Sequence, residues 1–243
     1  MINRDELESA LKDAERLERS YRAPTSTWAN EQIVIEETPE AFEICVSGST
    51  DLRDWLQNFS AWRWWNPRTW FSDQVSWQAR IPGTSYYATS GYVNAVGNVI
   101  RAIDRDDTKI SKNKAINLSG HSAGGPKAAL VAIELDRQGF SIRNLRTIGA
   151  PRWSTSKINI ACINRMKRYE TRADYIPTVP KTKPGRGWKA FGYQYQLGAP
   201  DVDYVLFYRD FEEAYRAHKI STYREEIQKE LLKHTEEMKS ESK

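Results

Sequence analysis

The sequence predicts an α/β fold with a mainly parallel central sheet covered by helices on both faces. Short apolar runs typical of strands alternate with amphipathic helical patterns, and short connections join them. One of these strand-to-helix junctions carries the pattern Gly-x-Ser-x-Gly. The chain has 243 residues, of which 40% are hydrophobic. This length and composition favour one sizeable core over two independent domains.

The elements before the motif follow from apolar periodicity. Residues 5–21 are expected to form a helix, because Leu7, Leu11 and Leu17 fall on one stripe. The same patterns predict strands at 33–35, 42–46 and 75–81 and helices at 51–59 and 92–104.

Beyond these elements, strands are predicted at 115–118, 145–148, 165–170 and 204–208, with helices at 123–137 and 211–238. We therefore divide the chain into an N-terminal amphipathic helix (1–25), a central domain (26–225) and a charged helical tail (226–243).

Composition excludes several classes of protein. No apolar run approaches the roughly 20 residues of a membrane span. The first twenty residues are charged throughout, unlike a secretory signal. Cys45 and Cys162 are too few for a disulfide scaffold or a cysteine-rich metal site. We therefore expect a cytoplasmic protein and make no prediction of its oligomeric state.

The net charge of +4 conceals a basic block at residues 141–200, with twelve Lys or Arg side chains against two acidic ones. Such a block is usually a solvated face; alternatively, it forms a mouth that prefers an anionic surface or head group. No RNA-recognition or helix-turn-helix motif accompanies it, so no nucleic-acid partner is expected.

The most specific motif is Gly-His-Ser-Ala-Gly-Gly at 120–125, between a predicted strand and a predicted helix. This context is typical of a strained turn that presents a serine nucleophile, here Ser122. Gly120 and Gly124 are expected because a Cβ atom at either position would collide with neighbouring backbone.

A serine nucleophile needs a general base and an acid that orients the base. Of the three histidines, His121 lies inside the turn and is expected to pack or to make a supporting hydrogen bond, and His234 lies in the charged tail. His218 is therefore the predicted base. The predicted acid is Asp174, at the end of a strand; the alternatives are Asp201, Asp203 and Asp210.

The oxyanion formed during acyl transfer needs hydrogen-bond donors from two loops. The backbone N–H of Ala123 is the first predicted donor. The second is expected from the Ser-Gly-Ser-Thr turn at 47–50, where Ser49 can offer its N–H and its hydroxyl.

Together these segments resemble the class 3, fungal triacylglycerol lipase-like branch of the α/β-hydrolases. The resemblance spans about residues 33–223 and rests on several segments. They are 46–49 followed by an Asp-Trp-containing stretch at 51–55, the elbow at 120–125, Gly-Ala-Pro-Arg at 149–152, Asp-Tyr-Ile-Pro at 174–177, and Ala-His at 217–218 with the following Tyr223.

The resemblance implies a Ser122–His218–Asp174 triad, an oxyanion hole at Ser49 and Ala123, an α/β-hydrolase fold over 26–225, and hydrolysis of lipid acyl esters. It also implies a lid at 50–59. No metal or organic cofactor is expected.

Six of the nine tryptophans fall within residues 55–77. They either pack a helix onto the sheet or line an acyl groove and contact a lipid–water interface. The candidate substrate or lid residues are Thr50, Leu52, Trp55, Trp62, Trp64 and Trp65.

The predicted function is that of a lipase or carboxylesterase acting on a lipid or small ester. Two alternatives are a phospholipase A-type activity on anionic lipids and a catalytically idle scaffold that binds a lipid or a protein.

Overall fold

The computed structural model describes residues 2–49, 78–179, 189, 191–198 and 210–241. Its central sheet has seven strands in the order β1-β2-β3-β6-β7-β8-β9. Their bounds are β1 Ser26–Trp28, β2 Glu31–Glu37, β3 Ala41–Val46, β6 Ala115–His121, β7 Ile142–Ile148, β8 Lys167–Thr171 and β9 Tyr193–Leu197. All pairs from β3 to β9 are parallel, and β1, β2 and β3 pair antiparallel at one edge. The mainly parallel sheet predicted from the sequence is confirmed.

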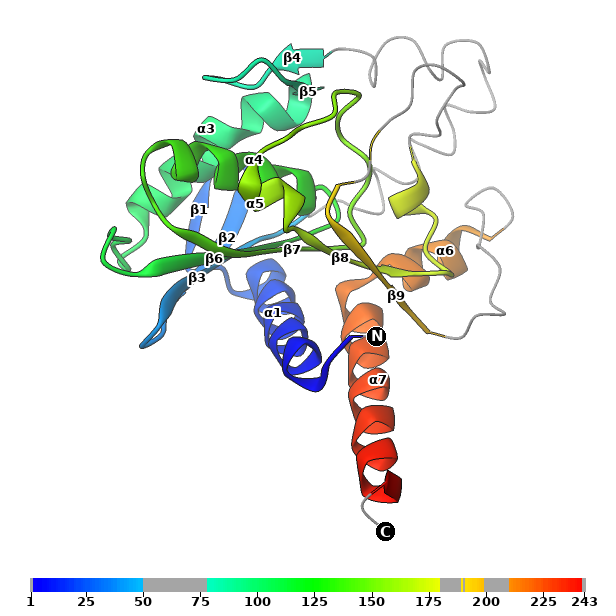
Figure 1. Ribbon diagram of the computed structural model, residues 1–243. Helices are drawn as coiled ribbons and strands as arrows, with labels where there is room; N and C mark the ends of the chain where they lie inside the picture. The colour runs from blue at the N-terminus through cyan, green and yellow to red at the C-terminus, as the bar shows by residue number, and fades with distance from the viewer. Residues whose placement is uncertain (1, 50–77, 180–188, 190, 199–209, 242–243) are drawn as a thin grey trace.

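Helices cover both faces of this sheet (Figure 1). One face carries α3 (Ser90–Arg105), α4 (Gly124–Arg137) and the short α5 (Ala161–Asn164); the other carries α1 (Arg4–Arg22) and α7 (Ile220–Glu241). The core is accordingly split into two clusters of buried apolar side chains, one on each side of the sheet. Side chains of β3 point alternately to the two faces, so Phe42, Ile44 and Val46 belong to the first cluster and Cys45 to the second.

Other elements depart from the predicted boundaries. A small two-stranded sheet forms from β4 (Gln78–Arg80) and β5 (Tyr87–Thr89). The helix predicted at 211–238 is interrupted, because Lys219 has an extended backbone that ends α6 (Phe211–His218) before α7 begins. The predicted domain boundary after residue 225 lies inside α7.

The strand β9 was not predicted, although Tyr193, Tyr195 and Leu197 alternate with two glutamines; most of the side chains of this edge strand are exposed. The helix predicted at 51–59 and the strand predicted at 204–208 lie outside the described residues.

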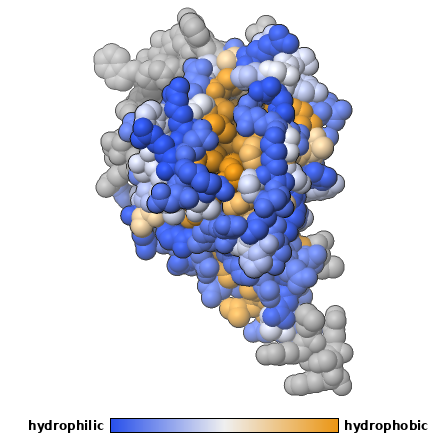
Figure 2. Space-filling model, turned by 90° about the vertical axis from the view of Figure 1, so that its left-hand side faces the viewer, coloured by the Kyte–Doolittle hydropathy of each residue, from blue (hydrophilic) through white to orange (hydrophobic). Residues whose placement is uncertain are grey.

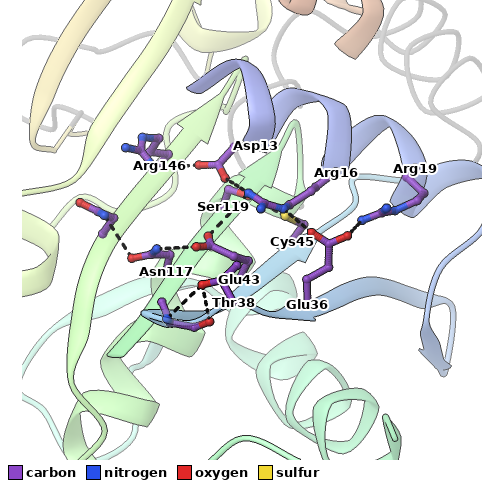
Figure 3. A network of polar contacts seen from close by, with 12 residues as sticks. Asp13, Arg16, Arg19, Glu36, Thr38, Glu43, Cys45, Asn117, Ser119 and Arg146 are labelled. Atoms are coloured by element: carbon purple, nitrogen blue, oxygen red, sulfur yellow. Dashed lines mark hydrogen bonds and ion pairs between the residues drawn. The ribbon is translucent and has the colours of Figure 1, made fainter. Parts of the chain in front are cut away.

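Ion pairs anchor α1 against the sheet, and Figure 3 shows the one between Asp13 and Arg146. Arg146 of β7, only 2% exposed, donates to both carboxylate oxygens of Glu6, at 2.9 and 3.1 Å, and to Asp13 at 2.8 Å. Burial raises the pKa of Glu6, but the hydrogen bonds and charge of Arg146 outweigh it and hold that pKa at about 2. For Asp13, burial prevails and raises the pKa.

These contacts also account for part of the basic block. Arg146 and Lys167 both bind Glu6, and Arg168 binds Glu170. Cations paired in this way balance buried acids instead of forming a free positive surface.

Within the described residues, every helix is too short or too polar to cross a lipid bilayer.

Candidate active site

The turn between β6 and α4 has the strain that the sequence predicts. Ser122 has a φ of 54°, a left-handed conformation that is rare for residues other than glycine. A Cβ atom on Gly120 would lie 2.2 Å from the carbonyl oxygen of Gly124, and one on Gly124 would lie 2.2 Å from that of Val46. Both glycines are therefore required by backbone contact, and the turn aims Ser122 beyond the end of the sheet.

His218, the last residue of α6, lies next to Ser122. The Ser122 Oγ atom lies 2.8 Å from His218 Nε2, and the His218 side chain is fully buried. These two residues are separated by 96 positions in the chain.

Asp174 completes the arrangement from the loop after β8. Its Oδ2 atom lies 2.6 Å from His218 Nδ1, and its Oδ1 atom accepts a hydrogen bond from the Ile176 amide at 2.9 Å. An ionised carboxylate only accepts, so Nδ1 carries the proton and Nε2 is free to accept from Ser122. Asp210 instead caps α6 by accepting from the Glu213 amide, and Asp201 and Asp203 lie outside the described residues.

Tyr223 is a supporting residue whose contact the sequence did not predict. Its hydroxyl donates to Asp174 Oδ2 at 2.7 Å and accepts from the Thr171 amide at 3.3 Å. Burial and the adjacent Asp174 raise the pKa of this phenol well above its usual value, so it stays a donor. In the sequence, Tyr223 is marked only by the resemblance of its segment to the lipase family, and nothing in its own neighbourhood indicates a contact with Asp174.

His121 makes the supporting hydrogen bond that its position suggests. Its Nε2 atom lies 2.9 Å from the backbone oxygen of His218, and its Nδ1 atom lies 2.7 Å from the hydroxyl of Tyr21. Burial, reinforced by His218, lowers the pKa of His121 well below its usual value, so the ring is neutral. No functional role for Tyr21 or for the rest of α1 is predicted from the sequence.

The two predicted oxyanion donors flank Ser122 on separate segments. Ala123 stands at the N-cap of α4, where backbone N–H groups lack partners within the helix. Ser49 is half-buried and follows Gly48, on which a Cβ atom would lie 2.9 Å from the Cβ of Ser122. The candidate substrate and lid residues (Thr50, Leu52, Trp55, Trp62, Trp64 and Trp65) lie outside the described residues.

An apolar groove lies on another part of the molecule, between α3 and α4. It has a volume of about 300 Å³ and is lined by side chains that include Val93, Ile100 and Ile133. On the side that carries these helices, an apolar band is exposed between hydrophilic side chains (Figure 2). Ser122, His218 and Asp174 do not line this groove, so it is separate from the triad.

Metal ligands are not gathered anywhere in the described part of the chain, where no three His, Cys, Asp or Glu side chains are placed to share an ion.

A parallel sheet, a strained serine turn and a buried Ser–His–Asp chain define the α/β-hydrolase class. Residues 44–183, more than half of the chain, match the family model described as lipase (class 3), so the chain belongs to the class 3 lipase family. No curated protein matches the chain in a comparison of sequences.

Solved structures agree at the level of the fold. The Rhizomucor miehei triacylglyceride lipase superposes with a TM-score of 0.58 at 16% identity, covering 81% of this chain and 82% of that one. Lip2 lipase from Yarrowia lipolytica gives 0.57 at 14% identity, covering 82% of each chain. The lipase from Rhizopus microsporus var. chinensis gives 0.54 at 14% identity, covering 88% of this chain and 85% of that one.

Proposed function

We propose that the protein is a serine hydrolase that cleaves carboxylic ester bonds of lipids through an acyl-enzyme on Ser122. The observation that carries this proposal is the hydrogen-bonded chain from Ser122 Oγ through His218 to Asp174, at 2.8 and 2.6 Å. Membership in the class 3 lipase family supports a lipid ester as substrate. The similarity to a triacylglyceride lipase supports an acylglycerol in particular.

In the acylation step, Ser122 Oγ attacks the ester carbonyl while His218 Nε2 takes its proton. Asp174 holds the imidazole in the tautomer required and stabilises the imidazolium that forms. The backbone N–H groups of Ala123 and Ser49 stabilise the oxyanion, and each such donor typically lowers the barrier by about 3 kcal/mol. His218 then protonates the departing alcohol.

In the deacylation step, a water molecule replaces the alcohol. His218 removes a proton from this water as it attacks the acyl-enzyme, and the acid is released when Ser122 recovers its proton. Asp174 holds the Nδ1 atom of the fully buried His218 at 2.6 Å, which leaves Nε2 to exchange protons in turn with Ser122, the alcohol and the water, so one imidazole serves both steps.

A neutral ester is favoured over an anionic phospholipid. The preference for an anionic head group depended on the basic block, and the pairing of Arg146, Lys167 and Arg168 with acidic side chains removes part of its free charge.

The test is hydrolysis of p-nitrophenyl esters from C2 to C16 and of emulsified triacylglycerol, by the wild type and by Ser122→Ala. We expect activity in the wild type and a loss of at least about 1,000-fold in the variant, with an unchanged circular dichroism spectrum. A folded wild type that cleaves none of these esters would refute the proposal. Equal activity in the two proteins would place the nucleophile elsewhere.

A further inference from the structure

We propose that Tyr21, in the last turn of α1, is a positioning residue of the active site. Its hydroxyl joins the loop that carries Ser49 to the ring of His121 and, through that ring, to His218. This inference rests on the proposed function, since positioning matters only if Ser122 reacts. It gives the N-terminal helix a role in catalysis.

The direction of each hydrogen bond follows from the groups involved. The backbone carbonyl of His218 can only accept, so the Nε2 atom of His121 carries the proton. The Nδ1 atom of neutral His121 is then an acceptor, and the hydroxyl of Tyr21 must donate to it over 2.7 Å. The oxygen of Tyr21 in turn accepts from the Gly48 amide over 2.7 Å. The relay therefore has one consistent pattern, from the Gly48 amide to the His218 carbonyl.

Burial keeps this pattern the same over the pH range in which a serine hydrolase works. It lowers the pKa of His121, with His218 adding to the effect, and it raises the pKa of Tyr21 far above neutrality. Both groups are thus uncharged, and neither changes its role as donor or acceptor.

One branch of the relay sets the position of the oxyanion loop. Because the Gly48 amide donates to Tyr21, the peptide unit between Ser47 and Gly48 is held in one orientation, and this fixes the backbone one residue before Ser49. The space is tight: a Cβ atom on Gly48 would lie 2.6 Å from the Tyr21 hydroxyl and 2.9 Å from the Cβ of Ser122. The Tyr21 hydroxyl therefore determines how closely this loop approaches the nucleophile.

The other branch reaches the general base. The carbonyl of His218 belongs to the last turn of α6, where carbonyl groups have no partner within the helix. His121 supplies that partner, and the two imidazole rings lie 5.0 Å apart. This hydrogen bond holds the end of α6, and with it the His218 ring, against the elbow at residues 120–125.

The part of α1 that precedes Tyr21 has buried contacts of its own, independent of the hydrogen bonds of Tyr21. Glu6 and Asp13 bind the buried Arg146, and about 22 Å of helix separates Glu6 from Tyr21. That separation offers a matched control. Tyr169 also donates a buried hydroxyl to α1, at 2.7 Å from Glu6 Oε1, at the end of α1 far from Tyr21.

The experiment compares Tyr21→Phe with Tyr169→Phe, each of which removes one hydroxyl bonded to α1. Two rates are measured: kcat on a p-nitrophenyl ester per active site, and the second-order rate at which a short-chain fluorophosphonate labels Ser122. We expect Tyr21→Phe, which removes the hydrogen bonds to His121 and to Gly48, to slow both rates by about 10-fold with little change in KM. Tyr169→Phe is expected to stay within about 2-fold of the wild type.

Because both rates refer to titrated sites, a variant that is merely less stable does not lower them. If Tyr21→Phe matches Tyr169→Phe in both rates while the wild type hydrolyses esters, the positioning role is wrong and the proposed function stands. If the wild type is labelled but cleaves no ester, and Tyr21→Phe is still labelled more slowly, the proposed function fails and the positioning role stands.

A second variant covers the case in which Tyr21→Phe does not fold. His121→Asn interrupts the same relay from its other side and is expected to slow labelling to a similar extent. Where both single variants fold, the double variant should be no slower than the slower single one, because both remove one connected unit. Additive losses, or labelling of His121→Asn at the wild-type rate, would overturn the relay.

Discussion

Replacing Glu6 by glutamine is expected to destabilise the protein by about 3 kcal/mol. Glu6 lies on α1 and accepts hydrogen bonds from both Nε and Nη2 of Arg146, whose guanidinium is almost entirely shielded from water. Its carboxylate also accepts from Lys167 and from the hydroxyl of Tyr169. An amide has one oxygen and no charge, so it cannot satisfy these donors together.

The magnitude follows from the environment of Arg146. Removing one partner of a buried ion pair usually costs about 3–5 kcal/mol, because the other charge is left without compensation. Here Asp13 keeps its 2.8 Å contact with Nη1 of Arg146, which favours the lower end of that range. A loss of this size is a large part of the stability of a typical domain, about 5–15 kcal/mol.

The assay is urea denaturation followed by circular dichroism at pH 7. Glu8→Gln serves as the control, because Glu8 lies on the same helix in an exposed pair with Arg4, at 43% and 48% exposure, and should cost less than about 0.5 kcal/mol. Salt at 1 M should abolish the effect of Glu8→Gln and leave that of Glu6→Gln largely intact. A change below about 0.5 kcal/mol for Glu6→Gln would refute the assignment of Arg146 as a buried charge that depends on Glu6.

Three further predictions follow from the site and from α1. Asp174→Asn should lower kcat by about 10,000-fold with the fold intact, since an amide no longer selects the reactive tautomer of His218. The control Asp210→Asn, at a helix cap, should remain active, and equal activities of the two variants would exclude Asp174 as the orienting acid. Gly124→Ala should abolish soluble folded protein, because the new Cβ would lie 2.2 Å from a backbone oxygen, and a normally folded variant would contradict this. Gly97→Ala, with no described atom within 4 Å of the new Cβ, should instead raise stability by up to about 1 kcal/mol in thermal unfolding. The pKa of Glu6 in the folded state, about 2, lies below its ordinary value of 4.5, so its contribution to stability is complete above pH 4.5 and is lost as the pH falls toward 2. In urea titrations, the difference in free energy of unfolding between the wild type and Glu6→Gln should shrink over that pH range, and a constant difference would contradict this.

The elbow could be predicted from the sequence because it is a local feature. A strand, two glycines spaced around a serine and a following helix lie within a few residues of one another, and the backbone contacts that require the glycines arise within that segment and the adjacent strand β3. The base and acid could also be named, since only three histidines are present and the order of the residues along the chain restricts the choice. The structure brings those same residues to within hydrogen-bond distance.

The edge strand β9 and the break at Lys219 could not be predicted in this way. The Tyr-Gln-Tyr-Gln-Leu sequence of β9 alternates, but most of its side chains are exposed, and its place in the sheet depends on pairing with β8. The sequence around Lys219 reads as continuous helix, and the contact that accompanies the end of α6 comes from His121, nearly a hundred residues earlier.

The sequence by itself determined the fold class and was enough to predict a nucleophile and its two partners, because these depend on short-range periodicity, on local sterics and on the supply of a few residue types. Only the tertiary structure decided what supports them: Tyr223 on Asp174, Tyr21 on Gly48 and His121, and Arg146 between Glu6 and Asp13. Most of these contacts join side chains that are far apart in the chain and buried together. A buried hydroxyl or guanidinium must find a partner wherever the fold places one, and no local pattern records which partner that is.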